Sequence, residues 1–211
     1  MTIIDLTQPL LPGMPVYPGD PPPVFTTVAT LASHGYRARQ ITMSTHTGTH
    51  IDAPAHCLAD GKTLDQFPAS HFSGPAQVLD CRAIGGDITL AHLAPLGVLL
   101  ETDFLLIRTG WDQRWGSAGY FTGFPVLSAD AVAWLASHSQ PIKGIGIDAP
   151  SVDGPESSDL ANHRMLLAHG IVIIENLAHL DAIPEGRCQL HCLPLLLTGS
   201  DAAPARVIAC C

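Results

Sequence analysis

Prolines and glycines punctuate this chain so often that only short elements fit between them. The 211 residues include 18 prolines and 19 glycines, and both residue types interrupt strands and helices. Nine β-like runs predict strands, at residues 2–6, 24–30, 39–45, 76–82, 104–109, 142–148, 171–175, 195–198 and 205–210. Two segments predict helices, at residues 128–138 and at residues 158–169, the second ending at Gly170. We therefore expect an α/β fold in which strands dominate.

The composition favours one packed domain that acts on a small molecule. Hydrophobic residues make up 46% of the chain and charged residues 14%, and no repeat or composition break marks a linker. A single domain over residues 1–211 is therefore expected. Nineteen acidic and ten basic residues give a net charge of −9, which opposes nonspecific binding to nucleic acid or to anionic membranes.

Signals for export and membrane insertion are not found in the sequence. The start, Met1-Thr-Ile-Ile-Asp5, lacks the basic and apolar regions of a leader, and no run reaches the ~18 apolar residues of a membrane span. We therefore expect a cytoplasmic location. A core of this size in that compartment needs no cross-links, so six cysteines are expected as reduced thiols. They are Cys57, Cys81, Cys188, Cys192, Cys210 and Cys211.

A cluster of histidines and one aspartate is the clearest chemical signal. His46, His50, Asp52 and His56 lie within eleven residues, and imidazole with carboxylate suits zinc, manganese or iron. A fully extended strand would hold His46 and His50 roughly 13 Å apart, too far for one ion. The chain must therefore bend, and Gly48 is the residue that bends at no Cβ cost. The alternative is that these are polar surface residues, or that they capture metal only adventitiously.

A second group of candidates lies more than a hundred residues downstream. His163 shares a helical face with Leu160 and Leu167 and is expected to point inward, where the alternative is a satisfied core histidine. Glu175 closes an apolar run, and a carboxylate there needs a cation or strong hydrogen bonds to stay ionised. A helix, a turn at Gly170 and a returning strand can bring His163 and Glu175 together. The pair is a plausible second half of a metal site.

These residues lie in segments that resemble the metal-dependent cyclase superfamily, which includes bacterial kynurenine formamidases and isatin hydrolases. The matching segments span nearly the whole chain: residues 15–20, 46–56, 105–109, 146–153, 163–164, 175–177, 193–195 and 199–206. The resemblance implies a compact swivelling β/β/α-type fold, a homodimer or higher homo-oligomer, and a small-molecule substrate.

The resemblance also implies roles for the individual residues. His46, His50 and Asp52 would bind one divalent ion, zinc or manganese, and Asp52 would bridge to a second ion. His163 and Glu175 would complete the site of that second ion. His56 would carry the proton.

One position bears on the substrate. Tyr17 stands where the formamidases carry Trp, and it is expected to bind an aryl group, although a loop aromatic in a subunit contact is an equal alternative. We expect metal-assisted hydrolysis of an amide-type bond, with an aryl formamide such as N-formylkynurenine as substrate. The alternatives are a cyclic imide or lactam hydrolase, a metal-dependent cyclase or dehydratase, and a catalytically silent metal-binding module.

Overall fold

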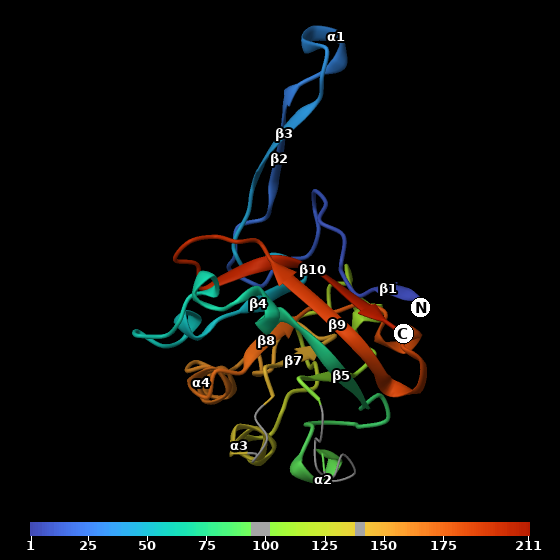
Figure 1. Cartoon of the computed structure of the whole chain (residues 1–211), viewed down its shortest axis with the longest axis vertical. Helices are drawn as coiled ribbons and strands as arrows, with labels where there is room; N and C mark the ends of the chain where they lie inside the picture. The colour runs from blue at the N-terminus through green and yellow to red at the C-terminus, as the bar shows by residue number, and fades with distance from the viewer. Residues whose placement is uncertain (94–101, 138–141) are drawn as a thin grey trace.

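Strands of one mixed sheet close into a barrel in the computed structural model, which describes residues 1–93, 102–137 and 142–211 (Figure 1). The strand order is β1-β10-β4-β8-β7-β6-β5-β9, and β9 also pairs with β10, so seven strands close on themselves and β1 extends the edge. The pairs β5–β6, β6–β7 and β7–β8 are parallel and the others antiparallel. The strands are β1 Ile3–Asp5, β4 His50–Asp52, β5 Ser73–Asp80, β6 Phe104–Arg108, β7 Gly144–Ile147, β8 Val172–Glu175, β9 Arg187–Pro194 and β10 Ala202–Cys210.

Two apolar cores lie on opposite faces of this sheet. In β6, Phe104 and Leu106 belong to the core inside the barrel, whereas Leu105 and Ile107 belong to the core beneath the helices. Because side chains alternate along a strand and both faces are covered, all four are buried and the run reads as continuously apolar. The covering helices are α2 Leu90–Leu93, α3 Ala129–Ser137 and α4 Ala161–Ala168.

Glycines in β7 allow close packing inside the barrel. A Cβ atom at Gly146 would lie 2.6 Å from Leu177 Cδ1 and 2.8 Å from Leu106 Cδ2. The alternation of glycine and isoleucine in this strand therefore reflects a filled barrel interior on one face and the helix-covered core on the other.

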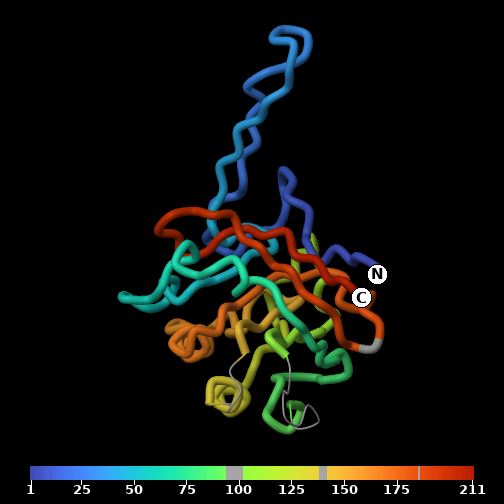
Figure 2. Tube along the Cα trace, viewed as in Figure 1, coloured from blue at the N-terminus to red at the C-terminus, as the bar shows by residue number. Residues whose placement is uncertain are grey.

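A two-stranded arm projects far from the barrel (Figures 1 and 2). It consists of β2 Val24–Ala29 and β3 Ala38–Thr42, which form a sheet of their own, and the tip helix α1 Leu31–His34. Thr30 caps this helix by accepting the N–H of Ser33, and Gly35 ends it with a φ of 74°. None of the residues of α1 is buried.

Most of the predicted elements are confirmed. Eight of the nine predicted strands and both predicted helices occur, with shifted ends, and the α/β class is confirmed. The last residue of the first predicted helix, at 138, lies outside the described residues. The second predicted helix begins at Ala161 rather than at residue 158, and Gly170, with a φ of 74°, follows its end as expected. Leu160 is therefore the cap of α4 and not part of its buried face.

Other expectations are not met or stay open. The strand predicted at residues 195–198 is wrong, because the neighbouring strand β9 ends at Pro194 and the chain then turns outward. The pairing describes a closed mixed barrel, so the swivelling β/β/α description is not confirmed. The single domain over residues 1–211 stays a prediction. Over the described ranges, no helix is long and apolar enough to cross a membrane.

Candidate metal centre

The predicted histidine cluster begins in a loop and ends on a short buried strand. Gly48 has a φ of 67°, so the chain bends there as the spacing required. His50 and Asp52 then occupy alternate positions of β4 and share one face. His46 lies in a loop before the bend, since the strand predicted to reach residue 45 ends at Thr42. The cluster is therefore half loop and half strand.

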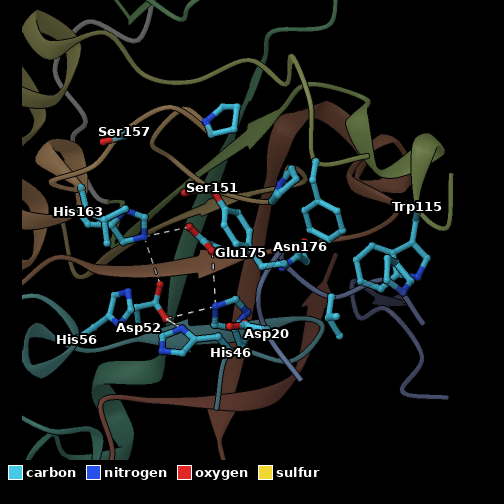
Figure 3. A pocket seen from close by; sticks show the side chains of 18 of the residues that line it. Asp20, His46, Asp52, His56, Trp115, Ser151, Ser157, His163, Glu175 and Asn176 are labelled. Carbon is cyan, nitrogen blue, oxygen red and sulfur yellow. Dashed lines mark ion pairs between the residues drawn. The ribbon is translucent and has the colours of Figure 1, made fainter. Parts of the chain in front are cut away.

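Two later elements bring the downstream candidates to the same place (Figure 3). Glu175 is the last residue of β8 and lies directly opposite His50 in the antiparallel pairing with β4. His163 lies in the first turns of α4 and is 3% exposed, which confirms that it points inward. Its Nε2 atom lies 3.1 Å from Glu175 Oε1 and 3.5 Å from Asp52 Oδ2. The structure thus unites the two halves that the sequence separates by more than a hundred residues.

Asp52 is at the middle of the cluster. His46 Nδ1 lies 2.9 Å from Asp52 Oδ1, and His50 Nε2 lies 3.3 Å from the same oxygen. His50 Nε2 is also 3.5 Å from Glu175 Oε2. Asp52 is 1% exposed, so this carboxylate is almost completely shielded from bulk water.

Each of the three inner histidines has one ring nitrogen occupied by an acceptor outside the cluster. Such an acceptor fixes the tautomer and turns the other nitrogen toward a metal. The outer pairs are His46 Nε2 with Asp201 Oδ2 at 3.0 Å, His50 Nδ1 with the carbonyl of Gly48 at 2.8 Å, and His163 Nδ1 with Asp153 Oδ2 at 2.7 Å. The free nitrogens all face Asp52 or Glu175.

The inner atoms of this cluster fit a cation. Four of them are buried without a hydrogen-bond partner in the described structure: His50 Nε2, both carboxylate oxygens of Asp52, and Glu175 Oε1. Buried carboxylates and lone pairs that face one another are costly unless a positive charge lies between them. The ligand atoms of His46, Asp52 and His56, and likewise those of His50, Asp52 and Glu175, lie within 4.8 Å of one another. The donor set of imidazole and carboxylate suits zinc or manganese.

The pKa shifts reflect the same crowding. Burial acts to raise the pKa of Asp52, but the neighbouring His50, His163 and His46 outweigh it and hold that pKa well below its usual range. Burial acts to lower the pKa of His163, but the hydrogen bond to Asp153 and the nearby carboxylates of Asp52 and Glu175 raise it well above the usual value. These groups therefore favour a charged arrangement in which negative oxygens face positive partners.

His56 lies at the rim of the cluster, at the end of a short 3₁₀ turn, Pro54–His56. Its Nδ1 atom is 3.5 Å from Asp201 Oδ2, and its ring centroid is 4.2 Å from that of His46. Burial lowers the pKa of His56, which keeps the neutral form present near pH 7. His56 is thus placed either to carry a proton or to add a ligand to the His46 and Asp52 group.

A cavity of 430 Å³ opens over the cluster and has an aromatic wall. Tyr17 lines it beside Phe121, with ring centroids 5.7 Å apart in an edge-to-face contact, and Trp115 also lines it. A turn places Tyr17 there: Asp20 donates its N–H to the carbonyl of Tyr17 at 2.9 Å, and Gly19 has a φ of 102°. Tyr17 is 38% exposed, so the alternative of a subunit contact stays open.

Sequence reasoning assigned no role to several of these residues. Asp153 and Asp201 lie inside the segments that carry the family resemblance, and that position is the signal that could have identified them. Asp153 also caps α4, since its carboxylate accepts the N–H of Asn162 at 3.0 Å and that of His163 at 2.9 Å. Trp115 and Phe121 had no such signal, because aromatic residues in loops more often pack against the core.

Comparisons with known proteins show the family of this chain. The cyclase family profile matches residues 4–154, and the chain belongs to this family. It is 37% identical over 211 residues to a kynurenine formamidase of Erythrobacter litoralis (strain HTCC2594), covering 98% of this chain and 92% of the relative.

Two solved structures share the fold. One, described as a potential metal-dependent hydrolase with cyclase activity, has 36% identity and a TM-score of 0.83, covering 99% of this chain and 96% of its own. The other is isatin hydrolase A of Labrenzia aggregata bound to benzyl benzoate, with 26% identity and a TM-score of 0.88. That alignment covers 99% of this chain and 93% of the hydrolase.

Proposed function

We propose that this chain is a metal-dependent hydrolase that cleaves an amide-type C–N bond, with an aryl formamide such as N-formylkynurenine as substrate. The observation that carries the proposal is the set of unpartnered buried atoms on His50, Asp52 and Glu175, which face one another and which a bound cation would satisfy. The aromatic wall of the cavity supports an aryl substrate, because offset and edge-to-face ring contacts are favourable. The kynurenine formamidase relative supports the formamide.

The residues would hold two divalent ions, zinc or manganese. His46, His50 and Asp52 would bind one ion, and Asp52 would bridge to a second held also by His163 and Glu175. A divalent cation in such a site polarises a substrate carbonyl and lowers the pKa of water from 15.7 to about 7. Asp201, Asp153 and the carbonyl of Gly48 would orient the three imidazoles.

His56 would move the proton. Asp201 Oδ2, 3.5 Å away, would keep the imidazole proton on Nδ1 and leave Nε2 as the acceptor. His56 Nε2 would take a proton from the attacking water and deliver it to the leaving nitrogen, which departs as a neutral amine. Tyr17 and Phe121 would hold the aryl ring so that the carbonyl lies over the cluster.

A cyclic amide is the second candidate substrate. The structural likeness to an isatin hydrolase favours this class, in which ring opening replaces release of formate. A cyclase or dehydratase reaction would instead leave the product without added water. The mass of the product separates hydrolysis from the cyclase and dehydratase reactions.

We also propose that the chain forms a homo-oligomer through its arm. Val28 and Leu31 are 51% and 55% exposed on the arm, and a two-stranded ribbon on its own is at best marginally stable in water. Two of the ten basic residues, Arg37 and Arg39, lie in the arm, whereas none of the 19 acidic residues does. The acidic remainder of a second copy therefore complements it.

The decisive experiment combines metal analysis with an assay panel. Purified protein is expected to hold zinc or manganese, to lose activity on strong chelation, and to hydrolyse N-formylkynurenine faster than isatin or simple lactams. Glu175→Gln and His163→Ala should each lower the metal-to-protein ratio, because the first removes a negative charge beside the second ion and the second removes an imidazole ligand.

The matched control for these variants is His169→Ala, an exposed histidine just after the same helix. It should keep the metal content and activity of the wild type. Undiminished metal and activity in both site variants would refute the downstream half of the site. Full activity in metal-free wild type would refute metal dependence itself.

A further inference from the structure

Two cysteines face each other across the seam that closes the barrel. The β9–β10 pairing ends with Gln189 opposite Cys210. Continued by one residue, this register places Cys188 opposite Cys211, which follows the last residue of β10. Both of these thiols are free and half-buried, and both side chains pack against the core inside the barrel. Cys210, one position earlier, points to the other face because side chains alternate along a strand.

The backbone hydrogen bonds of Cys211 show whether Cys188 and Cys211 form a hydrogen-bonded or a non-hydrogen-bonded antiparallel pair. Its carbonyl accepts the N–H of Thr2 at 2.7 Å, and its own N–H donates to the carbonyl of Thr2 at 2.9 Å. Both groups therefore point away from β9, so Cys188 and Cys211 form a non-hydrogen-bonded pair. In such pairs the Cα atoms lie about 4.5 Å apart, inside the range of roughly 4.4–6.8 Å that a disulfide spans.

We propose that Cys188 and Cys211 form a reversible disulfide that locks the barrel seam, with a small-molecule disulfide such as oxidised glutathione as the oxidant. One cysteine thiolate attacks the glutathione disulfide, giving a mixed disulfide and one glutathione. The other cysteine then attacks the cysteine sulfur of that mixed disulfide and releases the second glutathione. The two cysteines are oxidised, one glutathione disulfide is reduced to two thiols, and the cysteine protons pass to the two glutathione molecules.

The order of attack follows from the surroundings of the two thiols. Burial, with the neighbouring Cys211 and Cys210, raises the pKa of Cys188 to about 12, so it is a weak nucleophile near neutral pH. Cys211 therefore opens the reaction and Cys188 resolves it. The disulfide lies at the opposite end of β10 from Ala202, which pairs with Asp52, so the link stabilises the barrel without touching the candidate metal centre.

Peptide mapping tests the link. The protein is treated with oxidised glutathione, its free thiols are alkylated, and it is then unfolded and digested with trypsin without reduction. Cleavage after Arg187 and Arg206 separates residues 188–206 from residues 207–211. The disulfide joins these two peptides. The joined pair is expected in the wild type and in the matched control Cys210→Ser, and not in Cys188→Ser or Cys211→Ser.

Other outcomes would overturn the proposal. A disulfide between Cys210 and Cys211 would leave the two peptides separate, and a joined pair in Cys188→Ser would assign the link to Cys192. Thermal unfolding supplies the second readout: oxidation should raise the Tm of the wild type and of Cys210→Ser by roughly 5 to 10 °C. The Tm of Cys188→Ser should not rise. A joined pair with an unchanged Tm would show that the disulfide does not lock the seam.

Discussion

One carboxylate, that of Asp201, contacts two histidines with different proposed duties. Its Oδ2 atom lies 3.0 Å from His46 Nε2 and 3.5 Å from His56 Nδ1, and its side chain is 40% exposed. It therefore orients a proposed metal ligand and the proposed proton carrier from the same rim position. A substitution of Asp201 would disturb both metal binding by His46 and proton transfer by His56. A substitution of His56 would disturb proton transfer alone.

The first prediction concerns His56. His56→Ala should lower turnover by roughly 10²- to 10⁴-fold, which is the usual contribution of general acid–base catalysis, while the metal content stays near that of the wild type. Turnover and metal-to-protein ratio are measured on the same preparations, with His169→Ala as the control. A parallel loss of metal would reassign His56 as a ligand of the His46 and Asp52 group.

A second prediction at this scale concerns pH and Asp148, which is 1% exposed. Burial raises its pKa to about 6, although its carboxylate accepts N–H groups from Thr109 and Gly110. Because this pKa is higher in the folded than in the unfolded chain, the contribution to stability is present at low pH and is lost as the pH rises through about 6.

The measurement compares the wild type with Asp148→Asn, which cannot titrate. Between about pH 4 and pH 7 the unfolding free energy of the wild type should fall relative to the variant by up to about 3 kcal/mol. Chemical unfolding at several pH values gives this difference. A difference that does not change with pH would contradict the raised pKa.

The position of a side chain in the site is easier to predict from sequence when the residues that it contacts are close to it in the chain. His46, His50 and Asp52 stand close together in the chain, so their spacing alone indicated a bent metal loop. The proximity of His163 and Glu175 is predictable because a helix, a turn at a glycine and a strand that runs back beside the helix bring the two positions together. The outer acceptors Asp153 and Asp201 reach the histidines through long loops, whose paths no periodicity predicts.

At the scale of elements, the three residues of β4 depend on their neighbours. β4 pairs with β8 on one side and with β10 on the other, and the bend before it is fixed by Gly48. The carbonyl of Gly48 accepts from His50 Nδ1 at 2.8 Å and from Asn176 Nδ2 at 3.0 Å. Asn176 itself has a φ of 57°, a conformation that asparagine tolerates better than most residues.

The third prediction tests this bend. Gly48→Ala should lower the unfolding free energy by about 1–2 kcal/mol, because alanine disfavours a left-handed backbone. A Cβ there would also lie 2.8 Å from Leu10 Cδ2, so that side chain must shift. Metal affinity should fall as well, since the carbonyl that orients His50 moves.

The matched control is Gly85→Ala, where a Cβ meets nothing within 4 Å. Its unfolding free energy should stay within about 0.5 kcal/mol of the wild type. Equal stabilities for the two variants, with equal metal affinities, would show that the bend does not depend on glycine.

The elements that sequence missed share a physical cause. β4 was missed because three residues with two charged or polar side chains carry no apolar run. In β9, Cys188, Leu190 and Cys192 alternate with Arg187, Gln189 and His191, so the strand has a period of two but no continuous apolar run. The apolar run at residues 195–198 predicts a strand instead, although Leu196 is 82% exposed there. Register with neighbouring strands, not composition, decides these segments.

At the scale of the whole molecule, apolar surface lies on both the arm and the barrel. Leu195 and Leu196 are 50% and 82% exposed after β9, and Tyr36 is 59% exposed on the arm. Contiguous exposed apolar side chains on a folded chain mark surfaces that contact another molecule. A second copy that lays its arm against this surface would cover both patches at once.

The final prediction is the assembly itself. Light scattering after size exclusion should give a multiple of 22.3 kDa, and the double variant Val28→Asp with Leu31→Asp should shift it toward the single chain. Met165→Asp, at a 38% exposed methionine on α4, is the control and should keep the wild-type mass. A wild type of 22.3 kDa at every concentration would refute the homo-oligomer.

The pairing of β4 determines how late in synthesis this strand can form. Its partners β8 and β10 begin at Val172 and Ala202. The residues from His46 to Asp52 therefore leave the ribosome long before either partner strand is available to pair with them. At roughly 5–20 residues per second, the wait lasts roughly 6 to 30 s. During that interval the histidines and carboxylate are exposed on an unpaired segment, open to any ion in the cell that binds imidazole and carboxylate. We therefore expect the ion of the proposed metal centre to depend on the metals that the nascent chain meets.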